Sequence, residues 1–266
     1  MSAMAVRLAE AKSEGRAALL GYLPVGYPSV EGSIRAMVAM VEAGVDAVEV
    51  GIPYSDPVLD GPVIQKASEA ALARGTRVAD AFRAVEAVVA AGAPAVVMTY
   101  YNPMLQYGLE RFANDLATAG GSGVITPDLT PDAAGEWIAA AESRDLDRVF
   151  LVAPSSTPER LHMTAEASTG FLYATALMGV TGERAAVGDA AERLVTRARE
   201  AGASAVCVGL GVSTGKQAAQ VAAYADGVIV GSALVRALLD ANDEDAGIAA
   251  LKVKAEELAA GVRGRA

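Results

Sequence analysis

The chain has 266 residues and a formal net charge of −10 at pH 7, and 53% of its residues are hydrophobic. This length allows one large domain or two small ones, and the hydrophobic share is sufficient for a substantial core. The acidic residues are spread along the chain, which argues against a nucleic-acid surface because such a surface needs a basic patch. We therefore expect a cytoplasmic protein that binds no nucleic acid.

The chain contains one cysteine and one histidine, which limits the chemistry that its side chains can perform. Cys207 stands in the apolar run SAVCVGLG, so we expect a small buried side chain. A disulfide within the chain is impossible, and the cysteine and histidine spacing of a zinc site is absent. His162 lies in a charged, helix-like segment and is expected to face solvent. We therefore expect neither a Ser/His/Asp nor a Cys/His mechanism, and we predict no metal site.

The sequence predicts neither a signal peptide nor a membrane-spanning helix. Charged residues interrupt residues 1–20, which is not the layout of a signal peptide. The longest uncharged stretch covers residues 87–109, but it contains Gly92, Pro94, Pro103 and Gly108. We expect this stretch to form the end of a helix, a loop, a strand and a second loop.

Eight short apolar runs alternate with longer alanine-rich segments. The runs begin at Ala18, Asp46, Pro94, Ser122, Asp147, Gly170, Ser204 and Ala225. Segments such as residues 33–44 and 109–120 have apolar residues at the three- and four-residue spacing of a helix. This alternation predicts parallel strands, and eight units in one chain favour a single-domain (β/α)8 TIM barrel over residues 1–266. Extra helices are expected after Asp60 and near residues 240–260. An open doubly wound sheet is the alternative, although the GxGxxG signature is missing after the first strand.

Glycines cluster at the predicted carboxyl ends of three late strands. The clusters lie in residues 178–188, in residues 209–215, and at Gly231, which is followed by Ser232 and a helix. In such barrels, function gathers at this end of the strands, and the loops after strands seven and eight often bind phosphate. Glycine lets a phosphate approach backbone amides, and the helix start adds unpaired N–H donors. We predict a phosphate site, although any one cluster could simply form a tight turn.

Two acidic residues belong to the stretch VEVGIPYSDPVLDGPVIQ, residues 48–65. Strand alternation places Val48 and Val50 on one face and Glu49 on the other, so Glu49 points into the barrel if the valines face the helices. Burial there would raise its pKa and suit it to general acid/base chemistry. Asp60 follows in a loop that can fold back over the same end. The alternatives are a structural hydrogen bond for Glu49 and ordinary turn chemistry for Asp60.

This stretch closely resembles the signature of the tryptophan synthase alpha subunit family. The resemblance covers nearly the whole chain, and it includes GYLPVGYPS, GVTG, GLGVS and GVIVGSALV. It implies a (β/α)8 barrel that acts as a lyase in tryptophan biosynthesis. The implied reaction is the retro-aldol cleavage of indole-3-glycerol phosphate to indole and glyceraldehyde 3-phosphate, without a cofactor in this chain.

The resemblance also implies roles for individual residues. Glu49 would transfer the protons, and Asp60 would bind the indole N–H and stabilise the positive charge that develops there. Tyr22 would lie against the indole, Tyr173 would contact the glycerol part, and Thr181 would help to close the site. The implied apolar positions around the indole, each of which could otherwise be barrel core, are Met98, Ile125, Leu151, Leu210 and Ile229. The implied phosphate-binding positions are Gly182, Gly211, Gly231 and Ser232.

The chain departs from the family pattern at a few positions. Many relatives carry a Ser-Arg pair before the GVTG loop, where this chain has Ala176 and Leu177, which leaves loop closure and communication with a partner open. Pro24 stands where threonine is frequent, Tyr22 where phenylalanine is frequent, and Pro127 where alanine is frequent. None of these changes removes a catalytic group.

A partner is also implied by the resemblance. It is the tryptophan synthase beta subunit, which uses pyridoxal phosphate and receives indole through a tunnel in an α2β2 complex. Residues 53–62 and 101–103 match regions that meet it. Two alternatives stay open: a stand-alone lyase that releases free indole, and a non-catalytic barrel that activates a partner.

Overall fold

The computed structural model describes residues 1–175, 189–209 and 211–264. In these residues, parallel strands form one sheet in the order β5-β4-β3-β2-β1-β9-β8-β7-β6. The strands are β1 (Ala18–Pro24), β2 (Ala47–Gly51), β3 (Ala95–Met98), β4 (Gly123–Ile125), β5 (Asp147–Val149), β6 (Leu151–Val152), β7 (Leu172–Thr175), β8 (Val206–Gly209) and β9 (Gly227–Val230). Only Phe150 separates β5 from β6, and β5 pairs with β4 while β6 pairs with β7. The sheet therefore closes into a barrel, as predicted, and the open-sheet alternative is wrong.

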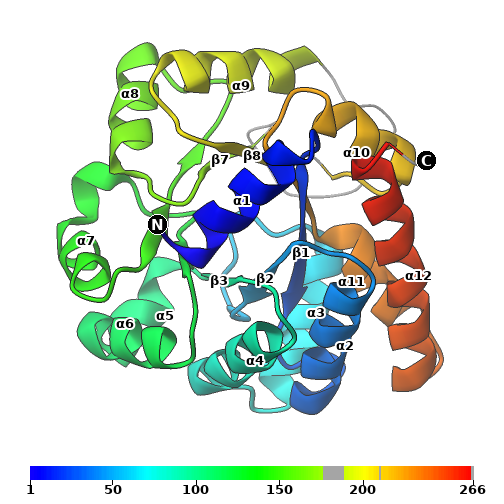
Figure 1. Ribbon diagram of the computed structural model, residues 1–266. Coiled ribbons are helices and arrows are strands. Elements are labelled where there is room, and N and C mark those ends of the chain that lie inside the picture. The colour runs from blue at the N-terminus through cyan, green and yellow to red at the C-terminus, as the bar shows by residue number, and fades with distance from the viewer. Residues whose placement is uncertain (176–188, 210, 265–266) are drawn as a thin grey trace.

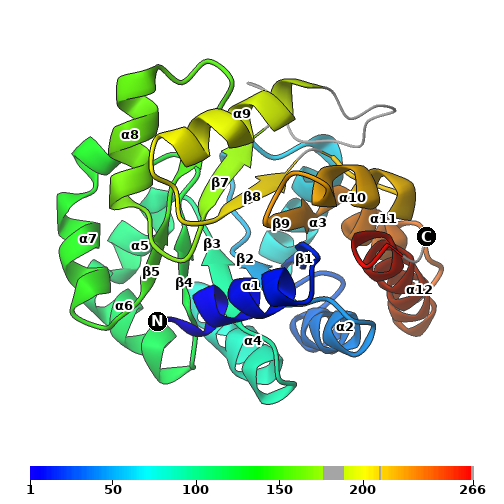
Figure 2. The same ribbon diagram turned by 45° about the horizontal axis from the view of Figure 1, so that its top comes forward.

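Helices surround the strands, as Figures 1 and 2 show. They are α1 (Ala3–Ser13), α2 (Val30–Glu42), α3 (Pro62–Ala73), α4 (Val78–Ala90), α5 (Tyr101–Tyr107), α6 (Leu109–Thr118), α7 (Gly135–Glu142), α8 (Pro158–Ala167), α9 (Asp189–Glu200), α10 (Gly215–Ala222), α11 (Ser232–Leu239) and α12 (Glu244–Val262). The extra helices expected after Asp60 and near residues 240–260 are α3 and α12. No helix in the described part of the chain is long and apolar enough to cross a membrane.

One local prediction is wrong. The sequence predicts a loop after the strand run that ends at Tyr101, but residues 101–107 form α5. Pro103 occupies the first turn of this helix, where its missing N–H removes no hydrogen bond, so the proline is tolerated there. Gly108 ends α5 with a φ of 93°, a conformation that glycine adopts without strain.

The core has an outer and an inner part. The outer part lies between strands and helices and includes Val48 and Val50. The inner part fills the barrel and includes Val96 and Cys207, so the cysteine is buried as expected. Three buried side chains of α1 complete the inner part: Met4, Leu8 and Ala11. Helix α1 therefore closes one end of the barrel, where it lies in front of the strands in Figure 1, and the other end is left for a site.

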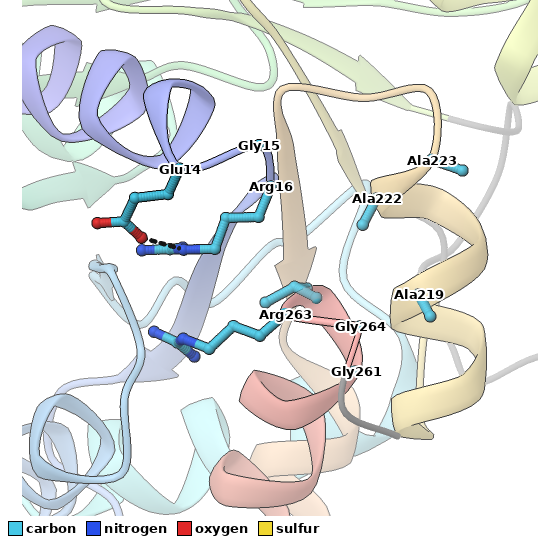
Figure 3. A pocket seen from close by; sticks show the side chains of 10 residues that line it. Glu14, Gly15, Arg16, Ala219, Ala222, Ala223, Gly261, Arg263 and Gly264 are labelled. Carbon is cyan, nitrogen blue, oxygen red and sulfur yellow. Dashed lines mark hydrogen bonds and ion pairs between the residues drawn. The ribbon is translucent and has the colours of Figure 1, made fainter.

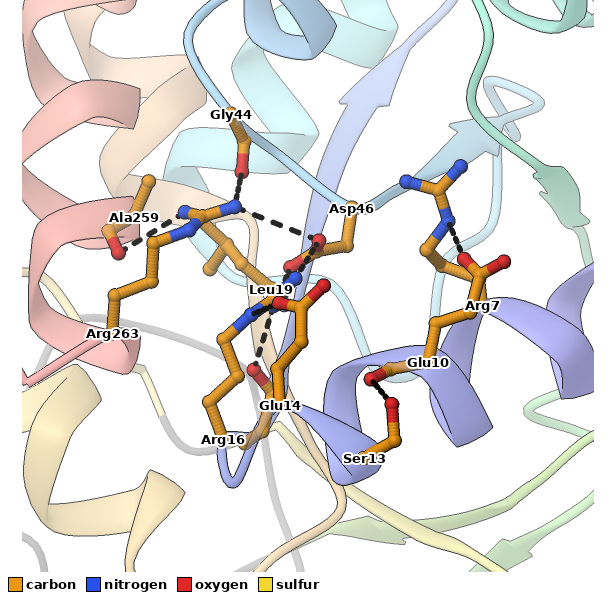
Figure 4. Close-up of polar contacts among 11 residues, drawn as sticks. Arg7, Glu10, Ser13, Glu14, Arg16, Leu19, Gly44, Asp46, Ala259 and Arg263 are labelled. Carbon is orange, nitrogen blue, oxygen red and sulfur yellow. Dashed lines mark hydrogen bonds and ion pairs between the residues drawn. The ribbon is translucent and has the colours of Figure 1, made fainter.

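A polar network, shown in Figure 4, ties together elements near the end that α1 closes. The buried Asp46 carboxylate accepts two hydrogen bonds from Arg16, at 2.8 and 3.0 Å, and one from the Leu19 N–H at 2.8 Å. Arg263 lies 3.6 Å from the same carboxylate and donates to the Gly44 carbonyl at 2.9 Å. The network thus links the start of β1, the start of β2 and the end of α12.

Candidate active site

Glu49 lies at the centre of β2 and points into the barrel. It is paired in register with Tyr22 on β1 and with Val96 on β3, and Val96 belongs to the inner core. Its neighbours Val48 and Val50 face the helices, so the alternation expected from the sequence places the carboxyl group inside. Glu49 is 1% exposed. No group in the described residues hydrogen-bonds to its Oε1 atom, so the structural hydrogen bond considered for this carboxyl is not seen at that oxygen.

Burial sets the protonation state of Glu49. Removal from water penalises the charged carboxylate and raises the pKa of Glu49 to about 8. The carboxyl group is therefore mainly protonated at neutral pH and can both give and accept a proton near that pH. This is the property required of a general acid/base.

Asp60 lies at the same end of the barrel, in the β2–α3 loop (residues 52–61). This loop begins where β2 ends and folds back, so the Asp60 side chain is only 7% exposed. Burial raises the pKa of Asp60 to about 6, which leaves the carboxylate mainly ionised at neutral pH. The two acids therefore differ in protonation state, since Glu49 holds its proton and Asp60 has lost it.

Two buried tyrosines lie beside these acids. The charges of Asp60 and Glu49 both raise the pKa of Tyr22, after the larger effect of burial. Burial, Glu49 and Asp60 likewise raise the pKa of Tyr173. Both phenol groups are therefore within electrostatic reach of both carboxyl groups. Their contacts with a substrate stay a prediction.

Glycines at two strand ends make room for these tyrosines. A methyl group at Gly51 would overlap the Tyr22 ring and hydroxyl, and one at Gly209 would overlap the Tyr173 hydroxyl. From the sequence, Gly51 belongs to the second strand and Gly209 to the glycine cluster at residues 209–215, and neither is expected to make room for a tyrosine. Their requirement is steric, and it becomes visible only when the strands are placed side by side.

Tyr100 is a further residue that the sequence analysis missed. It directly follows Thr99 at the end of β3, and its hydroxyl accepts the Val58 N–H at 3.1 Å and the Leu59 N–H at 3.0 Å. Burial and the charge of Asp60 raise the pKa of Tyr100, so it lies near this acid as well. The only signal in the sequence is an aromatic residue at the end of a strand.

The apolar positions implied for the indole line the barrel interior. The described members lie in the inner core or pack against it, and they are Met98, Ile125, Leu151 and Ile229. They occur on four different strands and face the interior of the barrel, into which the Glu49 side chain also points. Their contact with indole stays a prediction.

The implied phosphate positions lie at the ends of β8 and β9. Gly209 and Ile229 are paired in register, so Gly211 and Gly231 lie two residues beyond paired positions on neighbouring strands. Gly231 immediately precedes α11 and, as a glycine, has no side chain with which to cap the first turn of this helix. The first N–H groups of a helix have no partner within it, so they can bind an anion. Ser232 is the first residue of α11 and is buried.

Several predicted residues lie outside the described part of the chain. They are Thr181, Gly182 and Leu210, together with the departure at Ala176 and Leu177. His162 is exposed on α8, as expected from its charged surroundings. Within residues 1–175, 189–209 and 211–264, no three His, Cys, Asp or Glu side chains gather as metal ligands.

A cavity of about 540 Å³ lies near the opposite end of the barrel (Figure 3). Arg16 and Arg263 line one side, and Ala219, Ala222 and Ala223 line the other. Arg16 already binds Asp46 and Glu14, and Arg263 binds backbone carbonyls. These arginines stabilise the fold, and the cavity contains no buried acid that could act as a catalyst.

Comparisons with known proteins agree with the resemblance. The model of the family described as tryptophan synthase alpha chain matches residues 8–263. The tryptophan synthase alpha chain of Mycobacterium intracellulare is 63% identical over 255 residues, which cover 96% of this chain and 92% of that protein. The alpha chain of Salinispora tropica is 61% identical over 263 residues, which cover 99% and 98%. A solved structure of tryptophan synthase from Mycobacterium tuberculosis has a TM-score of 0.93 and 56% identity over 98% of both chains. The chain belongs to the tryptophan synthase alpha chain family.

Proposed function

We propose that Glu49 and Asp60 are the catalytic residues of the reaction of this family. The chain is a lyase of tryptophan biosynthesis and cleaves indole-3-glycerol phosphate to indole and glyceraldehyde 3-phosphate. One feature supports the assignment above all others: two buried carboxyl groups lie near the same two tyrosines, Tyr22 and Tyr173, at one end of the barrel. Burial raises the pKa of Glu49 to about 8 and the pKa of Asp60 to about 6. The environment thus gives the two acids different protonation states at neutral pH.

In the proposed mechanism, protonated Glu49 gives its proton to C3 of the indole ring. This step forms an indolenine with a positive charge at nitrogen, and the Asp60 carboxylate stabilises that charge through the N–H group. Glu49, now ionised, accepts the proton of the adjacent glycerol hydroxyl. The carbon–carbon bond then breaks, its electrons return to the ring to give indole, and the aldehyde of glyceraldehyde 3-phosphate forms. Glu49 is protonated again at the end of the cycle.

The remaining side chains orient the substrate. The phosphate group binds the N–H groups at the start of α11, together with Gly211, Gly231 and Ser232. The Tyr22 ring packs against the indole, and Tyr173 contacts the glycerol part. Thr181, Gly182 and Leu210 keep the roles that the resemblance gives them. Binding at both ends holds the reacting carbon near Glu49.

We further propose that the chain works in the cytoplasm without a cofactor, as the alpha subunit of an α2β2 complex. Pyridoxal phosphate then belongs to the beta subunit. Two apolar side chains support a docking surface at residues 53–62 and after 101–103: Val58 is 74% exposed and Leu105 is 48% exposed. Indole is apolar, so direct transfer to a partner would prevent its loss to solvent.

A steady-state assay tests this proposal. Indole release from indole-3-glycerol phosphate is measured with the chain alone and with added beta subunit. A large rise in turnover on addition of the beta subunit supports the subunit role. An equal rate in both samples favours the stand-alone lyase, and no turnover in either sample contradicts catalysis by this chain.

A further inference from the structure

We propose that Tyr100 is a positioning residue that holds the β2–α3 loop in place, so that Asp60 is presented to the substrate before the reaction starts. The proposal rests on the catalytic role assigned to Asp60. It begins from the two hydrogen bonds that the Tyr100 hydroxyl accepts, from Val58 at 3.1 Å and from Leu59 at 3.0 Å. Both donors are backbone N–H groups of the residues that directly precede Asp60.

These two bonds determine which way the side chains of the loop point. The Val58 side chain is 74% exposed, whereas Asp60, two residues later, is buried. On the other side of Asp60, the Gln65 side chain donates to the Asp60 carbonyl at 2.8 Å. Hydrogen bonds therefore hold the backbone on both sides of Asp60, and the bonds to Tyr100 come from outside the loop and its following helix.

Tyr100 itself is built into a rigid rim of the barrel. Its side chain is buried, and its carbonyl accepts a hydrogen bond from the Thr99 hydroxyl at 3.1 Å. The N–H of the next residue, Tyr101, donates to the Asp128 carboxylate at 3.0 Å. The Tyr100 ring also stacks on Tyr54 of the loop, with ring centroids 4.9 Å apart. The Tyr100 hydroxyl is therefore held in place by its surroundings, and as a hydrogen-bond acceptor it restrains the β2–α3 loop.

The consequence for the reaction concerns the transition state. Positive charge develops at the indole nitrogen as C3 is protonated and is absent from the bound substrate, so Asp60 stabilises the transition state more than the ground state. A charged group that is already in position stabilises that state without a cost of reorganisation. The phosphate group is bound by other residues, at α11. Loss of the Tyr100 hydroxyl should therefore lower kcat and leave KM nearly unchanged.

The test uses the full chain with Tyr100→Phe, which keeps the ring that stacks on Tyr54 and removes only the hydroxyl oxygen. Loss of two hydrogen bonds predicts a kcat about 10- to 100-fold lower, with KM within about threefold of the parent value. Hydrogen exchange should become faster at the Val58 and Leu59 amides and stay unchanged in the barrel strands. The exchange measurement needs no substrate, so it tests the restraint even if the chain fails to cleave indole-3-glycerol phosphate.

Two further variants complete the test. Tyr107→Phe removes a hydroxyl that donates to Asp115 at 2.6 Å on the outer helices, and it should keep the parent values of kcat and amide exchange. Tyr54→Ala keeps the Tyr100 hydroxyl but removes the stacked ring, and it should also speed exchange at Val58 and Leu59. The proposal is overturned if Tyr100→Phe leaves these two amides as protected as in the parent. A lower kcat without faster exchange also overturns it, because Tyr100 would then act on the substrate directly.

Discussion

Tyr22 links the two ends of the candidate site, because it is paired in register with Glu49 and its ring also lies against Gly231. A methyl group added at Gly231 would lie 3.2 Å from Cδ1 of the Tyr22 ring. Glu49 is the proposed proton carrier, and Gly231 precedes the helix that is proposed to bind phosphate. The Tyr22 ring thus lies between the acid Glu49 and the start of α11, and this arrangement suits the proposed binding of a substrate with an indole at one end and a phosphate at the other.

Glu49→Gln should abolish cleavage of indole-3-glycerol phosphate and preserve the fold. Glutamine has nearly the same shape but cannot give up or accept the proton, so turnover should fall by at least about 10²- to 10⁴-fold. The neutral side chain suits the buried position, so the thermal midpoint should not decrease. Steady-state kinetics and thermal unfolding measure the two effects, and normal turnover would refute the proton-transfer role.

The rate should depend on pH with two limbs. Activity needs Asp60 ionised and Glu49 protonated, so kcat/KM should rise as the pH passes about 6 and fall as it passes about 8. Because the pKa of Glu49 is raised to about 8, the decrease in activity above that pH corresponds to the loss of the Glu49 proton. A pH–rate profile of the free chain measures both limbs. A profile that stays flat from pH 7 to pH 10 would contradict the assignment of Glu49 as the acid.

Asp60→Asn should lower kcat severely while the substrate still binds. The amide can accept a hydrogen bond from the indole N–H, but it carries no charge to stabilise the indolenine. Loss of one preorganised electrostatic group predicts a decrease of about 10²- to 10³-fold in kcat. Phosphate binding at α11 is untouched, so KM should change little. An unchanged kcat would contradict the catalytic role and would show that Asp60 serves only to form the turn.

Ser232→Ala should weaken substrate binding more than it slows the reaction. Ser232 is buried at the first position of α11, where its hydroxyl can contact a phosphate group. A hydrogen bond to a charged group contributes about 1.5–3 kcal/mol, so KM should rise about 10- to 100-fold while kcat is retained. The kinetic constants of the variant measure this directly. A fall in kcat with a normal KM would place Ser232 outside the phosphate site.

Much of the barrel could be predicted from the sequence because its physical signals are local. Eight apolar runs became the barrel strands, and the alternation of Val48, Glu49 and Val50 correctly placed the carboxyl group inside. Helix α5 was missed because Asn102, Pro103 and Gly108 are turn formers, and the sequence alone does not show that Pro103 falls in the first turn of a helix. Helix α1 was not predicted, since its buried side chains meet partners that are distant in sequence.

The parts of the site that escaped prediction depend on contacts between distant segments. Tyr100 and the β2–α3 loop are about forty residues apart, and only the pairing of β2 with β3 brings them together. The spacing that Gly51 provides for Tyr22 likewise depends on the register of β1 and β2. By contrast, the pKa of Glu49 could be predicted to rise, because burial alone causes the shift.

Asp46→Ala should destabilise the fold without a direct effect on catalysis. Asp46 is buried near the end of the barrel that α1 closes, and it pairs with Arg16 and lies 3.6 Å from Arg263. Removal of one partner of a buried ion pair leaves the other charge uncompensated, which typically lowers the free energy of unfolding by about 3–5 kcal/mol.

Glu14→Ala is the matched control, because Glu14 binds the same arginine but is itself exposed. This variant should lower the free energy of unfolding by at most about 1 kcal/mol. Urea unfolding measures both changes, and kcat at a temperature where the variant is folded should match the parent. Equal costs for the two variants would show that Arg16 does not depend on its buried partner, and a decrease in kcat would connect this network to the site at the opposite end of the barrel.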